Sequence, residues 1–166
     1  MKTISVLFST YTDFPSKIVQ FLSHGDYTHV SLAIDDKNEY FYAFNTKGFR
    51  KEFPRKHKNR TKNNICYKLK ISDAQYKKLV KILQEFKKKE STSTYNWLGL
   101  IFCIFRIRIP RKENKCFCSQ FIARILERAE IIKLKKHSGK YLPYQLKREI
   151  ASSPLVIEKV VNCFPC

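Results

Sequence analysis

The sequence predicts an α+β protein in which one mostly antiparallel sheet packs against helices. Two observations favour this class. Strand-like segments with an early hairpin fill the first half of the chain, and the clearest helical patterns follow in the second half, without repeated βαβ alternation. A chain of 166 residues, of which 43% are hydrophobic and 14% aromatic, is long enough to bury one core and too apolar for disorder. We therefore expect a single domain over residues 1–166.

The first part of the chain predicts three strands and a short helix. Thr3–Ser9 is an apolar run typical of a buried strand, and Thr28–Ile34 alternates and is rich in branched residues. Between them, Pro15–Leu22 places proline in the first turn of a helical pattern. The turn signal Asp36–Asn38 predicts a hairpin whose return strand is Glu39–Asn45.

A basic segment precedes the clearest helix. Gly48–Asn64 is rich in lysine and arginine and is predicted as a loop, and Ile65–Ile71 returns to strand. Ser72 then caps a helix, and Gln75 completes a capping box. The apolar face of this helix follows the 3.6-residue period and comprises Tyr76, Leu79, Val80, Leu83 and Phe86.

The remaining elements alternate between apolar and basic segments. Trp97–Phe105 is predicted as a short buried helix, and Ile107–Arg111 as an irregular basic connection. A further amphipathic helix begins near Cys118. Pro143–Ile150 is the last short helix, and Leu155–Val161 is the final strand.

The charge balance indicates an affinity for anions. Lysine and arginine number 33 against 14 aspartate and glutamate, so the formal net charge is +19. Nucleic acid, anionic lipid head groups and other polyanions all fit this charge, which does not choose among them. No signal peptide or apolar run of roughly 18 residues is present, so we expect a cytoplasmic protein. The apolar Trp97–Phe105 and the arginines after it would also suit a protein peripheral to a membrane surface.

Cys118 and His29 form the candidate catalytic pair. A cysteine is a nucleophile only as a thiolate, and free N–H groups in the first turn of a helix stabilise that anion. Cys118 falls in such a turn, and His29 is the one histidine within a predicted strand, which would aim its ring. Taken singly, each residue is equally typical of a buried core position. The chain has no glycine-rich phosphate loop, dinucleotide fingerprint or zinc-protease motif, so no cofactor is predicted.

The segments Tyr27–Ile34 and Cys116–Leu126 carry a resemblance to a known family. They resemble the histidine strand and the cysteine helix of the circularly permuted papain-like amidases, which are YiiX-like relatives of the NlpC cell-wall peptidases and of lecithin retinol acyltransferase. Phe117–Ile122 matches the family's opening Phe-Cys-Ser, polar residue and apolar run, and the histidine precedes the cysteine as in the permuted group. The resemblance implies a permuted papain-like (NlpC-type) fold with Cys118 as nucleophile and His29 as general base.

A third polar group should orient the imidazole, and in this family it lies on the strand after the histidine. Many members carry glutamate before alanine there, where this chain has Tyr42. A hairpin turning around Lys37 would set Asn45 opposite His29. A shift of one residue would instead make Glu39 and Tyr42 the alternatives.

The end of the first strand offers polar groups for substrate. Thr10, Tyr11 and Thr12 are candidates to complete an oxyanion hole with the backbone N–H of Cys118. We expect Tyr11, Thr12 and Tyr42 to contact the substrate.

The predicted function is a thiol hydrolase or acyltransferase that opens an amide or ester bond through an acyl-enzyme. The resemblance implies a peptide, a cell-wall peptide or an acyl-lipid as substrate, and no specific nucleic acid as partner. The alternative is a basic nucleic-acid-binding domain without catalysis, with aromatic residues interleaved among its lysines. A rival zinc site would use the four thiols of Cys116, Cys118, Cys163 and Cys166.

Overall fold

The structure of the chain is a computed structural model. It describes residues 1–11, 26–35, 37–53, 61–96, 98, 100, 103 and 115–163. The predicted helix Pro15–Leu22, the predicted basic connection Ile107–Arg111 and the candidate residue Thr12 lie outside the described residues.

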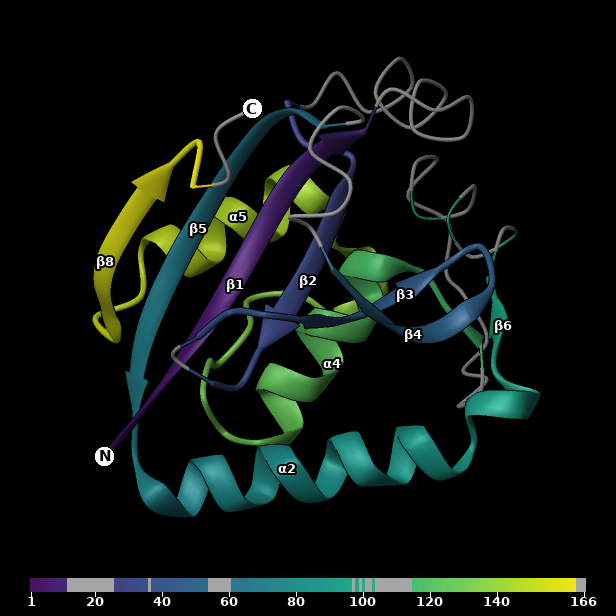
Figure 1. The fold of residues 1–166 in the computed structure, drawn as a ribbon, viewed down its shortest axis with the longest axis horizontal. Coiled ribbons are helices and arrows are strands. Elements are labelled where there is room, and N and C mark those ends of the chain that lie inside the picture. Colours follow the sequence, from purple (N-terminus) through teal and green to yellow (C-terminus); the bar gives the residue numbers. More distant parts are fainter. Residues whose placement is uncertain are drawn as a thin grey trace.

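Six strands form one sheet in the order β4-β3-β2-β1-β5-β8 (Figure 1). Every neighbouring pair is antiparallel, which confirms the predicted α+β class with a mostly antiparallel sheet. The strands are β1 (Lys2–Tyr11), β2 (His29–Ala33), β3 (Phe41–Asn45), β4 (Gly48–Glu52), β5 (Thr61–Ile71) and β8 (Val156–Val161). The N-terminal strand β1 therefore lies inside the sheet, between β2 and β5.

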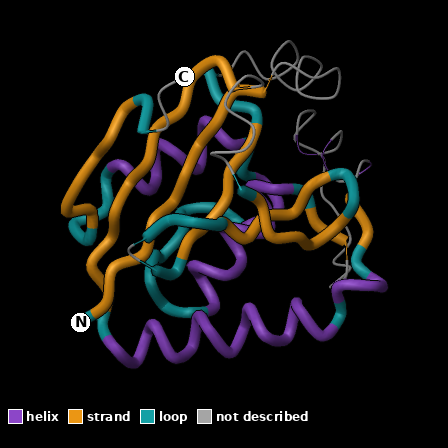
Figure 2. Tube along the Cα trace, in the orientation of Figure 1, coloured by secondary structure: helices purple, strands orange, loops and turns teal. Residues whose placement is uncertain are grey.

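Three α-helices accompany this sheet in the described part of the chain (Figure 2). They are α2 (Asp73–Lys88), α4 (Cys118–Arg128) and α5 (Pro143–Ala151), all at their predicted places. α4 packs on β2 and β3, and both α2 and α5 pack on α4. The predicted capping box of Ser72 and Gln75 is present at the start of α2. Short elements complete the described chain: η2 (Glu90–Thr92), β6 (Thr94–Tyr95), β7 (Lys115–Cys116) and η3 (Ser138–Lys140).

Four phenylalanine rings join the strands to the helices. Phe44 of β3 and Phe49 of β4 both contact Phe121 of α4, with ring centroids 5.7 and 5.6 Å apart. Phe86 of α2 meets Phe121 at 5.0 Å in an edge-to-face arrangement. Aromatic pairs in such geometries add about 0.5–1.5 kcal/mol each beyond the area they bury. The rings therefore fix β3 and β4 relative to the start of α4.

Strand β4 corrects the prediction that Gly48–Asn64 is a loop. Gly48–Glu52 is a strand that pairs with β3, because the Phe49 ring is buried in the core opposite Phe44. The burial of that ring outweighs the charged residues around it. β5 also begins at Thr61, before the predicted Ile65.

The predicted buried helix Trp97–Phe105 is described at three positions only. Leu98, Leu100 and Cys103 have helical backbone. Leu100 and Cys103 are buried, but Leu98 is 66% exposed, so the segment is not buried throughout. No helix among the described residues is long and apolar enough to span a membrane.

We predict that Gly48→Ala destabilises the protein by about 2 kcal/mol or more. Gly48 has a φ of +88°, where a side chain is strained, and an added Cβ would overlap the backbone carbonyl of Ser93. Urea denaturation measures the loss. Lys47→Ala, at an exposed neighbouring position, is the control and should change the unfolding free energy by less than about 0.5 kcal/mol. Equal stability of Gly48→Ala and wild type would contradict this account of the turn.

Candidate active site

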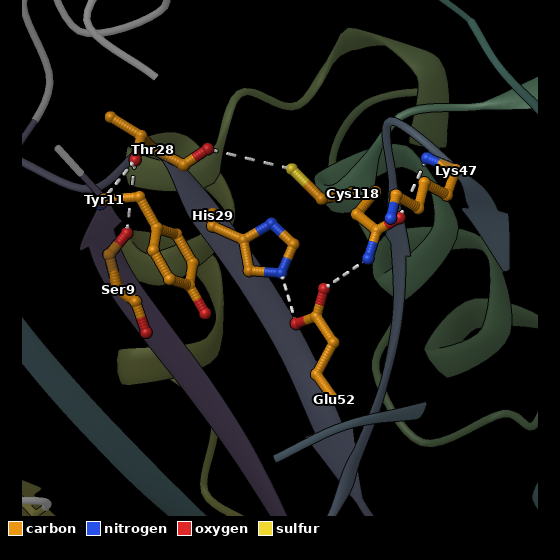
Figure 3. Close-up of polar contacts among 8 residues, drawn as sticks. Ser9, Tyr11, Thr28, His29, Lys47, Glu52 and Cys118 are labelled. Atoms are coloured by element: carbon orange, nitrogen blue, oxygen red, sulfur yellow. Dashed lines mark hydrogen bonds and ion pairs between the residues drawn. The ribbon is translucent and has the colours of Figure 1, made fainter. Parts of the chain in front are cut away.

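Cys118 is the first residue of α4, and its side chain is 4% exposed. The N-cap residue Phe117 provides no side-chain hydrogen bond to the first turn. The N–H groups of that turn are therefore not neutralised by a capping oxygen, and they favour negative charge at the start of the helix. The Cys118 thiol donates to the backbone carbonyl of Thr28 at 3.8 Å, which ties α4 to the residue before β2 (Figure 3).

His29 is the first residue of β2 and is also buried. Its ring lies between the Cys118 sulfur and the Glu52 carboxylate (Figure 3). Nε2 and the Glu52 Oε2 are 2.8 Å apart. The other ring nitrogen, Nδ1, lies on the side of Cys118 (Figure 3), and the Cys118 side chain is one of the groups that raise the pKa of the ring. The structure thus brings together the two residues predicted as nucleophile and base.

Glu52 is the group that sequence reasoning missed. It is the last residue of β4, within the segment predicted as a loop, so its approach to the imidazole was hidden by the error in secondary structure. One signal in the sequence could have predicted β4. Thr46 and Lys47 form a two-residue hairpin connection between Asn45 and Gly48, and a glycine often follows such a turn.

Asn45 contacts Glu52, not the His29 ring that the sequence predicts as its partner. Leu32 pairs with Tyr42, which is the register expected for a hairpin turning around Lys37. The Asn45 amide nevertheless donates to Glu52 Oε1 at 2.9 Å, while its own Oδ1 accepts from the Lys47 backbone N–H. In this arrangement Glu52 contacts the ring and Asn45 holds Glu52.

The surroundings of His29 favour the imidazolium form. Burial alone lowers the pKa of an imidazole, but the negative charge of Glu52 and hydrogen bonds with Cys118 and Glu52 act in the opposite direction. The effects of Glu52 and Cys118 outweigh that of burial, so the pKa of His29 is well above its ordinary value. The site therefore favours the protonated ring, which can act as an acid beside the sulfur.

The predicted substrate-contacting residues are divided between the site and the core. The Tyr11 ring meets the His29 ring edge to face at 5.3 Å, and the Tyr11 N–H donates to the Thr28 hydroxyl at 3.1 Å. Tyr42 instead stacks on Phe49, with centroids 5.8 Å apart. The Thr10 hydroxyl donates to the carbonyl of Asp26.

Three of the other described cysteines, Cys66, Cys103 and Cys116, lie in surroundings that raise their pKa values. Burial raises the pKa of Cys103 to about 12 and that of Cys116 to about 11. A hydrogen bond with Cys163, followed by burial, raises the pKa of Cys66. Among the described residues no three His, Cys, Asp or Glu side chains are grouped to hold a metal ion. Cys166, which completes the rival zinc set, lies outside the described chain.

Comparison with known proteins shows a fold and no family. No protein-family model matches the chain, and no curated protein matches it. Among solved structures, the chain is similar to the crystal structure of metalloprotein YiiX from Escherichia coli O157:H7, described as DUF1105, with a TM-score of 0.59. The alignment covers 96% of each chain at 15% sequence identity. The chain therefore has a YiiX-like fold.

We predict that Glu52→Gln lowers the pKa of His29, because it removes the negative charge that raises it. Imidazole titration followed by NMR measures this directly. Glu39→Gln, which removes an exposed carboxylate that sequence reasoning offered as an alternative, should leave the titration unchanged. An ordinary His29 pKa in the wild type, or an equal shift in both variants, would contradict the assignment.

The contact between His29 and Glu52 also makes the stability of the fold depend on pH. A histidine whose folded-state pKa is raised stabilises the fold fully below its unfolded value of about 6.5. That stabilisation is lost as pH rises through the folded-state pKa. Between a pH of about 6.5 and the folded-state pKa of His29, the unfolding free energy should therefore fall more steeply with pH in the wild type than in Glu52→Gln.

Proposed function

We propose that the protein is a thiol hydrolase or acyltransferase of permuted papain-like fold, acting on an amide or ester carbonyl. One observation carries the proposal: the buried His29 ring turns one nitrogen towards Cys118 at the start of α4 and is bonded through the other nitrogen to Glu52 (Figure 3). A nucleophile, a base and an orienting group in series are the arrangement that covalent catalysis requires. The YiiX-like fold supports the proposal. The histidine and cysteine segments of the sequence resemble those of the YiiX-like amidases, so the same fold was expected from them.

The reactive form is the Cys118 thiolate beside the protonated ring of His29, which is the form that the surroundings of His29 favour. The thiolate attacks the carbonyl carbon, and the electron pair of the C=O bond moves to oxygen to form a tetrahedral oxyanion. The oxyanion collapses, the bond to the leaving group breaks, and His29 gives that group its proton. In the second half His29 takes a proton from water or another acceptor, which attacks the thioester and releases Cys118.

Neighbouring groups have separate tasks in this reaction. Glu52 holds the ring through Nε2 and stabilises its positive charge, and Asn45 holds Glu52. Both are positioning residues. The backbone N–H groups at the start of α4 receive no side-chain cap from Phe117, and they favour the oxyanion. Tyr11, whose ring edge meets His29, is the candidate contact for the substrate.

The proposed substrates are a peptide, a cell-wall peptide or an acyl-lipid, each of which presents the required carbonyl. The net charge of +19 favours substrates that carry, or lie beside, negative charge, such as an anionic membrane surface. The YiiX structure is described as that of a metalloprotein. In the described part of this chain, no three His, Cys, Asp or Glu side chains are grouped to hold a metal ion.

We predict that iodoacetamide alkylates Cys118 before Cys66, Cys103 and Cys116 at neutral pH. The raised pKa values of those three thiols keep them protonated, whereas the protonated ring of His29 lies beside Cys118 and favours its thiolate. Peptide mapping after brief labelling measures the order. His29→Gln should slow the labelling of Cys118, and His137→Gln, at an exposed position, is the matched control. Faster labelling of Cys103 would argue strongly against the proposed nucleophile.

We predict that Cys118→Ser lowers turnover by at least about a thousandfold, because a serine hydroxyl is a far weaker nucleophile beside this imidazole. A p-nitrophenyl acyl ester and a peptide p-nitroanilide serve as probes. Glu52→Gln should lower kcat at least about tenfold, with partial recovery in Glu52→Asp. Cys103→Ser should retain activity. Hydrolysis by Cys118→Ser at the wild-type rate would refute the mechanism.

A further inference from the structure

Cys163 lies over the sheet because the chain reverses just after the last strand. β8 pairs with β5 up to Val161, and the Asn162 N–H then donates to the Asn64 carbonyl at 2.8 Å. Asn162 has a φ of 51°, in the left-handed region that asparagine adopts more readily than most residues. This turn brings the next residue, Cys163, back towards β5.

The returning side chain meets a second cysteine. The Cys163 thiol donates to Asn64 Oδ1 at 2.9 Å, and Cys163 packs against a buried cluster that contains Leu7, Phe41 and Cys66. Asn64 and Cys66 are two residues apart on β5, so their side chains share one face of the sheet. Cys163 is also the first cause of the raised pKa of Cys66. Cys66 and Cys163 therefore lie close together on this face of the sheet, although they are far apart along the chain.

We propose that Cys66 and Cys163 are an oxidation site, at which a peroxide converts the two thiols into a disulfide that ties β8 to β5. The site does not rest on the proposed function, since neither residue belongs to the candidate active site. Its partner in the reaction is hydrogen peroxide or an organic hydroperoxide.

The steps balance with one peroxide. Cys163, which is half-exposed, attacks the peroxide as a thiolate; the O–O bond breaks, and the sulfur becomes a sulfenic acid as water leaves. Cys66 then attacks the Cys163 sulfur, an S–S bond forms, and a second water leaves with its proton. Two electrons pass from the sulfurs to the peroxide, and two thiols with one hydrogen peroxide give one disulfide and two waters.

The order of these steps follows from the surroundings of the two thiols. Cys66 is buried, and both its hydrogen bond with Cys163 and its burial raise its pKa, so it keeps its proton until its partner has reacted. Cys103, Cys116 and Cys118 are buried as well. Cys163 is thus the described cysteine that a dissolved peroxide reaches first.

The bridge has a measurable mechanical effect. It closes a loop of about 100 residues, and a loop of that length removes much of the conformational freedom of the unfolded chain. We expect oxidation to raise the midpoint of thermal unfolding by about 5–15 °C. The amides of β8, which lies at the edge of the sheet beside β5 (Figure 1), should also exchange more slowly with solvent.

The experiment uses the full chain with Cys166→Ser, so that the C-terminal tryptic peptide, residues 160–166, contains Cys163 alone. The protein is treated with hydrogen peroxide, remaining thiols are blocked with iodoacetamide, and unreduced peptides are analysed by mass spectrometry. The expected product joins residues 63–68, which contain Cys66, to residues 160–166. The matched control adds Cys163→Ser, and Cys118→Ala shows that the reaction does not need the proposed nucleophile.

Each outcome decides the proposal. The cross-linked peptide, a rise in the unfolding midpoint that dithiothreitol reverses, and loss of both in the Cys163→Ser control would support it. A disulfide from Cys163 to any other cysteine, or oxidation of Cys163 that stops at sulfenic or sulfinic acid, would overturn it. An unchanged unfolding midpoint and unchanged β8 exchange after complete cross-linking would overturn the claim that the bridge ties β8 to the sheet.

Discussion

Glu52 brings a negative charge into a site where only 13% of its side chain remains exposed, and His29 beside it is 11% exposed. A buried carboxylate is stable only when it is paired and hydrogen-bonded. Glu52 has both partners it needs, the imidazole on one oxygen and the Asn45 amide on the other. The geometry around the sulfur of Cys118 depends on this pairing, because it fixes which ring nitrogen faces the thiol.

The pairing in turn depends on apolar packing some distance away. Glu52 can reach His29 only if β4 is part of the sheet, and β4 is held there by Phe49 against Phe44 and Phe121. Phe121 belongs to the helix that begins with Cys118. The same ring cluster therefore positions the carboxylate and the thiol, and a change in its packing would move both ends of the hydrogen-bonded series together.

Sequence reasoning found the elements whose signal is local. Cys118 was predicted at a helix start from the 3.6-residue period that follows it, and His29 within a strand from the branched residues around it. Glu52 was missed because β4 is a five-residue strand among charged residues, recognisable only by the burial of Phe49. Asn45 was predicted to contact the ring, and the hairpin register was right, but a side chain from the neighbouring strand lies between them.

The position of β1 between β2 and β5 bears on how the chain folds as it is synthesised. β1 can pair with β2 as soon as the first thirty or so residues are available, and β3 and β4 can extend that edge soon afterwards. The contact between His29 and Glu52 is fixed only later, when Phe121 of α4 packs on Phe49 of β4. Cys118 gains its imidazole only when a much later helix docks on β2 and β3. A nascent chain would carry an ordinary thiol, and its special reactivity would appear only with the completed fold.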